Sequence, residues 1–238
     1  MTRRRFIADT WTPTTATLTG DQALHLSRVL RATPGQIYDI VSNGFLHRAE
    51  ITHVSEAQVD FLLHEELQSD ATLPLHLLLA VFKFDHMEWA IEKATELGVA
   101  RITPILARRT EKHLAQAALK RSERWRRIAL ESAKQSRRTD IPEIPDPLPL
   151  KTALEREQSP TRILLSETEQ ITTLTAALTH VTPIADTALA IGPEGGWTPE
   201  EISLFTKHNW QPVTLGPRIL RAETAAIAAI AIAGPHLT

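Results

Sequence analysis

The sequence predicts an α/β protein built in two parts, a small N-terminal domain over residues 1–70 and a larger domain over residues 71–238. Two observations predict this division. The first part holds short runs of alternating apolar and polar residues separated by turn residues, which is typical of strands. In the second part, fully apolar runs alternate with helical patterns, which is typical of a mostly parallel sheet covered on both faces.

The N-terminal part is expected to form a small β-barrel or another compact β domain. Glycine-containing turns at 33–35 and 42–44 separate its apolar runs, and one helical pattern interrupts them at 21–31. The predicted strands lie at 5–8, 16–19, 36–41, 48–54 and 58–64.

The C-terminal part begins with a buried-type strand at 75–82 and an amphipathic helix. Asp85, with Glu88 three residues later, has the spacing of a capping box, and Gly98 is expected to end the helix. Further strands are predicted at 102–106, 163–166, 188–191 and 212–215.

Three later helices are expected. A long one runs through the basic segment that ends at Arg138 and stops before Ile141-Pro142. Thr198 is placed to cap the next helix, with Pro199 at its first position. The last helix is expected over 221–233, stopped by Gly234 and Pro235.

Composition excludes several classes of protein. The chain has no cysteine, so disulfides, thiolate metal sites and cysteine nucleophiles are excluded. The ten histidines show no metal-type spacing, so no metal is expected. The basic N-terminus lacks the apolar segment of a secretory signal, and the alanine-rich stretch 225–233 is too short to span a membrane. We expect a cytoplasmic protein with no membrane partner.

Positive charge is concentrated in one segment. Residues 101–138 contain 12 basic and 3 acidic residues, a net charge of +9, whereas the rest of the chain contains 14 basic and 25 acidic residues. Such a segment is typical of a polyanion-binding surface, and a solvated helix face explains it equally well from charge alone.

The segment 191–197, Ile-Gly-Pro-Glu-Gly-Gly-Trp, follows a predicted strand. Its glycines let backbone amides approach a ligand closely, and Pro193 stiffens the loop. A simple tight turn explains glycine and proline but not Glu194. The spacing matches neither the dinucleotide fingerprint nor the phosphate-binding loop. We therefore expect a largely neutral, flat ligand such as an adenosine group.

The segment 215–225, Leu-Gly-Pro-Arg-Ile-Leu-Arg-Ala-Glu-Thr-Ala, opens the last helix. Arg218 and Arg221 oppose the helix dipole there, so stability alone does not call for them. They indicate a ligand or a carboxylate partner; the alternative is that Glu223 pairs locally with an arginine. The small residues that follow allow packing against the core, which we favour, or against a second subunit.

The basic helix carries further candidates. Gln135, Arg137 and Arg138 lie near its end, where polar groups can bind RNA phosphates or a base. Trp125, among arginines, could stack on a base, but a half-buried anchor is the commoner role.

Glu88, Glu92 and Glu96 are spaced by four residues on the first helix of the second part. Like charges so placed destabilise an isolated helix. We predict that this stripe faces arginines elsewhere, such as Arg108 or Arg109.

Several motifs in order resemble one family. Residues 83–85 and 92–99, Arg124-Trp125, Gln135-Ser136 with Arg138, and both glycine loops are similar to the bacterial 16S ribosomal RNA uracil-N3 methyltransferases of RsmE type, in the SPOUT (α/β-knot) superfamily. The motifs span about residues 80–230, and the N-terminal part fits more loosely through 26–31. Two departures are the 108–111 segment and Lys134, which stands where an acid is usual.

The resemblance implies a PUA-like RNA-binding β-barrel, a SPOUT domain with a trefoil knot, a homodimer, and S-adenosyl-L-methionine as methyl donor. The substrate implied is 16S ribosomal RNA, and we expect it to be methylated on the assembled small ribosomal subunit. The residues implied to bind the cofactor are Leu165, Ser166, Glu167, Ile191, Gly192, Pro193, Glu194, Gly195, Gly196, Leu215, Gly216, Arg218, Ile219, Leu220, Glu223, Thr224 and Ala225. The residues expected to bind RNA are Arg5, Arg28, Arg31, Arg108, Arg109, Arg124, Arg127, Gln135 and Arg137.

Methylating uracil N3 requires the loss of a proton with a pKa of roughly 9–10, close to that of a phenol. The sequence offers no obvious base. Our hypothesis is that Arg138 or Arg221 stabilises the uracil anion, with Glu194 or Glu223 as a weaker candidate base. The alternatives are a ribose 2′-O methyltransferase, a non-catalytic RNA-binding module with a vestigial cofactor pocket, and a nucleotide-binding enzyme without RNA.

Overall fold

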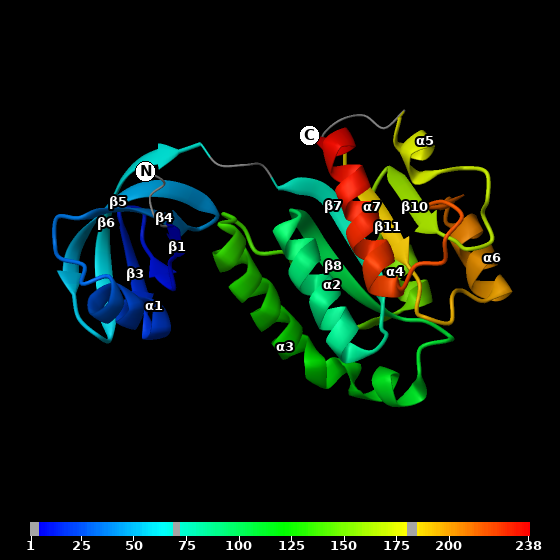
Figure 1. Cartoon of the computed structure of the whole chain (residues 1–238), viewed down its shortest axis with the longest axis horizontal. Helices are drawn as coiled ribbons and strands as arrows, with labels where there is room; N and C mark the ends of the chain where they lie inside the picture. The colour runs from blue at the N-terminus through cyan, green and yellow to red at the C-terminus, as the bar shows by residue number, and fades with distance from the viewer. Residues whose placement is uncertain (1–4, 69–71, 180–184) are drawn as a thin grey trace. The chain divides into compact units, whose positions relative to one another are not determined.

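The computed structural model describes residues 5–68, 72–179 and 185–238 (Figure 1). The chain divides into two compact units. One comprises Met1–Asp70 with Ala133–Asp140, and the other comprises Ala71–Ser132 with Ile141–Thr238.

The first unit is built on a six-stranded sheet in the order β1-β4-β5-β6-β3-β2. Strand β1 is parallel to β4, and the other neighbours are antiparallel. All five predicted strands are present, and closure into a barrel stays a prediction. The strands are β1 (Arg5–Ile7), β2 (Thr10–Trp11), β3 (Thr15–Thr19), β4 (Ile37–Ser42), β5 (Phe45–Val54) and β6 (Gln58–Leu67).

Local signals explain this sheet. Asn43 and Gly44 both adopt positive φ, 51° and 82°, in the two-residue turn between β4 and β5, as the Asn-Gly pair predicts. The expected helix is α1 (Gly20–Leu24), which continues as the π-helical turn η1 (His25–Val29). Leu18, Leu26 and Phe61 form part of the buried core of the first unit.

The second unit is built on a six-stranded sheet in the order β12-β10-β11-β7-β8-β9, in which every neighbouring pair is parallel. The predicted mostly parallel sheet is confirmed. The strands are β7 (Leu73–Ala80), β8 (Val99–Leu106), β9 (Leu148–Pro149), β10 (Thr161–Leu165), β11 (Thr187–Ile191) and β12 (Gln211–Val213). The helices are α2 (Phe84–Glu96), α3 (Lys112–Ser136), α4 (Leu150–Arg156), α5 (Leu174–Leu178), α6 (Pro199–Lys207) and α7 (Ala222–Leu237).

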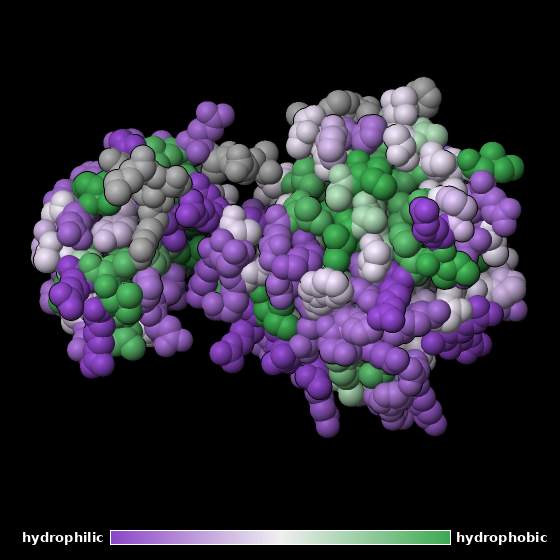
Figure 2. Space-filling view, viewed as in Figure 1, coloured by the Kyte–Doolittle hydropathy of each residue, from purple (hydrophilic) through white to green (hydrophobic). Residues whose placement is uncertain are grey.

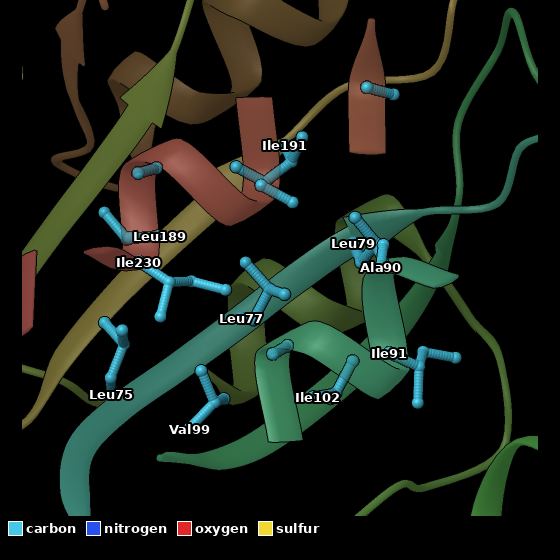
Figure 3. Packing of buried hydrophobic residues seen from close by; sticks show 14 of the residues in the cluster. Leu75, Leu77, Leu79, Ala90, Ile91, Val99, Ile102, Leu189, Ile191 and Ile230 are labelled. Carbon is cyan, nitrogen blue, oxygen red and sulfur yellow. The ribbon is translucent and has the colours of Figure 1, made fainter. Parts of the chain in front are cut away.

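Alternate residues of the strands pack into two apolar layers. Leu75, Leu77 and Leu79 of β7 pack with residues of α2, α3, α5 and α7 on one face, as Figure 3 shows for part of this cluster. Leu78 and Ala80 pack with residues of α4 and α6 on the other face. The sheet is therefore buried on both sides, which explains its continuous apolar runs.

The capping predictions had mixed outcomes. Thr198 caps α6, and Glu201 completes a capping box. The capping box predicted at Asp85 is wrong, because the N-cap of α2 is Lys83, two residues earlier, and it makes no side-chain cap hydrogen bond. The helix begins at Phe84, whose ring packs on the core. Gly98 follows α2 with a φ of +93°, as expected of a residue that ends a helix.

The stop predicted at Gly234 and Pro235 is also wrong, because α7 continues to Leu237. Proline removes one backbone donor, but Leu237 is 1% exposed and its burial favours the extra turn. No helix of the described residues is both long and apolar enough to cross a bilayer.

The glutamate stripe on α2 does not face Arg108 or Arg109. Glu88 receives two hydrogen bonds from Arg124 of α3, at 2.7 and 2.8 Å. In the same helix, Nζ of Lys93 lies 2.8 Å from Oε1 of Glu92 and 2.8 Å from Oε1 of Glu96. Arginine from another helix therefore balances Glu88, whereas a lysine within the stripe balances the other two.

Candidate active site

Three loops emerge from one edge of the second unit's sheet. Strands β12, β10 and β11 are parallel neighbours, so their carboxyl ends, at Val213, Leu165 and Ile191, lie at the same edge. The loops that follow contain both glycine segments and Ser166-Glu167. This is the edge where parallel α/β sheets bind ligands.

Hydrogen bonds tie these loops together. The indole Nε1 of Trp197 donates to the carbonyl of Leu165 at 3.1 Å, and the amide of Ser166 donates to the carbonyl of Val213 at 3.0 Å. Thr173 and Thr214 form an isolated bridge between two of the loops. The structure thus brings all three predicted cofactor segments into one cluster.

Steric and conformational constraints explain why glycine occupies several positions in this cluster of loops. A Cβ at Gly192 would lie 3.1 Å from Trp197 Nε1, and one at Gly195 would lie 3.2 Å from Arg109 Cβ. Gly196 and Gly216 have φ values of +68° and +115°, which favour glycine. A Cβ at Gly216 would meet nothing within 4 Å, so the backbone there faces open space that a ligand can fill.

The start of α2 lies against two of these loops. The amide of Lys83 donates to Glu194 Oε1 at 3.4 Å, and His86 Nδ1 lies 3.4 Å from Glu223 Oε1. Local pairing of Glu223 with an arginine is therefore wrong; its partner is His86. The sequence pattern did not single out His86, because the contact joins residues 137 positions apart, from α2 and α7.

Glu223 stands out among the described carboxylates of the site. The residue is 2% exposed, and its Oε2 is buried without a hydrogen-bond partner among the described residues. Burying a polar atom without a partner costs free energy, so such an atom is a candidate for ligand contact. Glu194, by contrast, is exposed.

Arg108 and Arg109 face the glycine loop and α6. Arg109 Nη1 donates to the carbonyl of Gly195 at 2.6 Å, and the Arg108 amide donates to Glu201 Oε1 at 2.7 Å. Arg109 therefore braces the loop at 192–198, a role that its prediction as an RNA contact did not include.

Two further arginines at this edge, Arg218 and Arg221, are exposed. Arg221 is the exposed N-cap residue of α7, with no side-chain cap hydrogen bond. Arg218 and Ile219 are also exposed, and Ile219 is 85% exposed. Exposed side chains of this kind, on a loop beside open backbone, are available to a ligand.

Many residues of the basic segment already have partners. Arg124 pairs with Glu88, Arg126 pairs with Glu123 and Asp146, and Arg138 pairs with Asp140. Trp125 is wholly buried and packs edge-on against Phe84, so the half-buried anchor is corrected to a core residue on the inner face of α3. Figure 2 shows a mainly hydrophilic surface over α3.

The remaining RNA candidates are exposed except Arg5, which is half-buried. Arg127, Gln135 and Arg137 lie on or directly after α3 with exposed side chains. In the first unit, Arg31 is exposed, Arg28 pairs with Glu56 at 2.7 Å, and Arg5 donates to the carbonyl of Arg137. Arg138 and Arg137 belong to this unit, whereas Arg221 and Glu194 belong to the second.

Comparison with known proteins gives the family. A family model described as an RNA methyltransferase domain matches residues 69–234. The chain is 36% identical, over 91% of its length and 72% of the relative's, to ribosomal RNA small subunit methyltransferase E of Synechocystis sp.. This chain belongs to the RsmE-type family of RNA methyltransferases.

Two further comparisons agree with this methyltransferase assignment. The Bacillus subtilis methyltransferase of the same name is 32% identical, over 91% of this chain and 88% of the relative. A solved structure of ribosomal RNA small subunit methyltransferase E from Neisseria gonorrhoeae, bound to S-adenosyl methionine, is similar with a TM-score of 0.81 and 29% identity, covering 97% and 96% of the two chains. The methyltransferase therefore has the α/β fold of the SPOUT type, with its parallel sheet.

Among the described residues of the methyltransferase, no three histidine or acidic side chains are grouped so as to hold a metal ion. The polar groups that the site does offer are carboxylates, arginines and backbone amides, which suit an organic ligand.

Proposed function

We propose that this protein transfers a methyl group from S-adenosyl-L-methionine to N3 of a uridine in 16S ribosomal RNA, on the assembled small ribosomal subunit. That the chain is an S-adenosylmethionine-dependent rRNA methyltransferase follows from its family. The modified atom and the assembled substrate are the proposed part. One observation supports the site most strongly: three loops at one sheet edge bring together the open backbone at Gly216 and the buried carboxylate of Glu223, whose Oε2 has no hydrogen-bond partner among the described residues.

The residues present fit the cofactor. The open backbone at Gly216 and the closely packed Gly192–Gly196 loop suit a flat adenosine group, and the backbone of Leu165–Glu167 closes the third side of the cluster. When bound, the cofactor supplies a methyl group on a positively charged sulfur. The residues expected to hold the cofactor are those of the three loops. We propose that the chain forms a trefoil knot in this region.

The N3 atom reacts only after its proton is removed or its anion is stabilised. Arg221 is the better candidate to stabilise the uracil oxygens, because its guanidinium is exposed at the same edge as Glu223. Arg138 is held by Asp140 and remains a second candidate. For the base we favour Glu223 over the exposed Glu194, because Glu223 is buried and its Oε2 has no hydrogen-bond partner in the described ranges of the chain.

The RNA is proposed to bind through exposed arginines. The first unit is proposed to be a PUA-like RNA-binding domain, with Arg5, Arg28 and Arg31 as contacts. On α3, Arg127 and the residues after its end are proposed to contact phosphates. The target base is expected to leave its stack to reach the site. We also propose that the protein works in the cytoplasm as a homodimer.

Methyl transfer from labelled S-adenosylmethionine tests which atom is modified and which form of the RNA is the substrate. The protein is incubated with purified small subunits and, in parallel, with naked 16S rRNA, and the methyl group is mapped by mass spectrometry of nuclease digests. We expect methyl transfer to uracil N3, faster on subunits. A methyl group on a ribose oxygen would instead support the 2′-O alternative.

Calorimetry tests the remaining alternatives. We expect the protein to bind S-adenosylmethionine when no RNA is present. Absence of binding would favour a non-catalytic RNA-binding module. Binding without any RNA affinity would favour a nucleotide-binding enzyme that does not act on RNA.

A further inference from the structure

The carboxylate of Glu223 is both buried and incompletely bonded. It lies in the first turn of α7, it is 2% exposed, and Oε2 has no hydrogen-bond partner among the described residues. A buried acceptor of this kind is normally satisfied by a donor. The N3–H group of uracil is such a donor, and it is also the proton that the reaction must remove.

The other oxygen of Glu223 leads toward solvent. Oε1 lies 3.4 Å from Nδ1 of His86, whose side chain is 31% exposed. On the far side of the imidazole, Nε2 lies 3.7 Å from Oδ2 of Asp85, whose side chain is 78% exposed. These are the titratable groups that the described contacts place against His86, one from α7 and one from α2 itself; Glu194 lies at Lys83, just before α2 begins.

We propose that His86 carries the N3 proton from Glu223 to solvent during methyl transfer. The inference rests on the proposed function. Because Glu223 is almost fully buried, water cannot readily take up a proton that it accepts, so turnover needs an exit. A histidine between a buried and an exposed carboxylate provides one.

Glu223 Oε2 accepts the N3 proton, the N3–C bond to the methyl group forms, and the bond between that carbon and the sulfonium sulfur breaks, with its electron pair left on the sulfur. After rotation of the carboxyl group, Glu223 passes the proton to Nδ1 of unprotonated His86. The imidazole then releases its Nε2 proton to Asp85 or water, which restores the starting state after the tautomers exchange.

Chemical rescue of His86→Ala tests this role. We expect kcat on small subunits to fall about 10–100-fold, within or just below the usual contribution of a positioned acid or base. Added imidazole should restore much of the rate, because it can occupy the vacated space and carry the proton. The affinity for S-adenosylmethionine, measured by calorimetry, should stay within about twofold of wild type. His86→Asn, which keeps a polar side chain but cannot relay a proton, should lose rate similarly.

His113→Ala is the matched control. His113 Nδ1 lies 3.5 Å from Glu111 Oε2, an equivalent pair, but its side chain is 72% exposed and it lies outside the site. Its rate should equal that of wild type with or without imidazole.

Three results would overturn the proposal. They are a His86→Ala rate equal to wild type, a rate loss that imidazole does not change, and a rate loss matched by an equal loss of cofactor affinity. Glu223→Gln gives a separate check, with kcat expected to fall by a larger factor than the affinity for the cofactor. Weaker cofactor binding with unchanged kcat would overturn the role of this carboxylate as the base. Mapping the methyl group in the wild-type product judges the proposed function independently, since rescue by imidazole does not depend on which atom is modified.

Discussion

At the scale of single residues, the proposed site combines an exposed arginine with a buried carboxylate, one of whose oxygens has no hydrogen-bond partner among the described residues. Arg221 and Glu223 are two positions apart at the start of α7, yet one is exposed and the other is buried. An arginine at a helix N-terminus opposes the dipole, so its presence there is not explained by helix stability.

Replacing Arg221 should therefore lower activity without unfolding the protein. We expect Arg221→Ala to reduce kcat on small subunits about 10²-fold, the loss typical of removing a group that stabilises developing negative charge. Thermal unfolding should be unchanged. Arg138→Ala tests the second candidate, and Lys207→Ala, an exposed change on α6, serves as control. Full activity in both arginine variants would remove arginine stabilisation from the mechanism.

Arg137 offers a second test at this scale. It follows α3 with a φ of +61°, a left-handed conformation in which glycine or asparagine is the usual residue. An arginine there indicates that its side chain serves another purpose. Arg137→Gly should keep or slightly raise the free energy of unfolding while lowering the affinity for RNA in filter binding. Unchanged RNA affinity would mean that the side chain does not contact RNA.

At the scale of elements, α3 separates its charged residues by role. Arg126 donates to the carbonyl of Ile144 at 2.8 Å and pairs with Asp146 and Glu123, whereas Arg127 is exposed. The net charge of the segment therefore overstates what is available to RNA, because several of its arginines serve the fold.

This difference makes the two neighbours a matched pair. Arg127→Ala should weaken RNA binding and reduce the slope of log affinity against log salt by roughly 0.7–0.9, the value for one lost phosphate contact, with stability unchanged. Arg126→Ala should lower the free energy of unfolding by about 1–3 kcal/mol, because it takes this donor from the carbonyl of the buried Ile144, with little change in the salt slope. The reverse result would reassign the RNA-facing side of α3.

At the scale of the whole molecule, the sheet of the second unit separates the site from a distant ion pair. His76 in β7 lies 3.5 Å from Glu157, which follows α4 and precedes β10. Burial alone would raise the pKa of Glu157, but hydrogen bonds from His76 and from the amide and hydroxyl of Ser159 lower it from 4.5 to about 2. The hydrogen bond to Glu157 raises the pKa of His76 above 6.5, against the opposing effect of burial.

These shifts predict that the His76–Glu157 pair stabilises the fold most in mildly acidic solution. The contribution of Glu157 is complete above pH 4.5 and is lost as the pH falls toward 2. The contribution of His76 is complete below pH 6.5 and is lost as the pH rises through its raised pKa. Urea unfolding of wild type and Glu157→Gln should therefore differ by about 1–3 kcal/mol near pH 5.5 and by less near pH 3 or above pH 8. A difference that does not vary with pH would contradict the ion pair.

The sequence by itself indicated the change of periodicity near residue 70, the parallel sheet, most helices and strands, the helix cap at Thr198, and the two glycine loops. These are local properties, because an apolar run, a turn residue or a helix cap can be recognised from a few neighbouring residues. It did not show α4, α5 or β9, which are short and carry weak periodic signals.

Only the tertiary structure decided which charged residues meet. The pairing of Glu88 with Arg124 instead of Arg108 or Arg109, the full burial of Trp125, the continuation of α7 past Pro235 and the contact between His86 and Glu223 each depend on packing between distant segments. A charged side chain can satisfy its hydrogen bonds with any partner that packing brings within reach. Its role as a structural pair or as a free functional group therefore follows from the fold and not from its neighbours in the sequence.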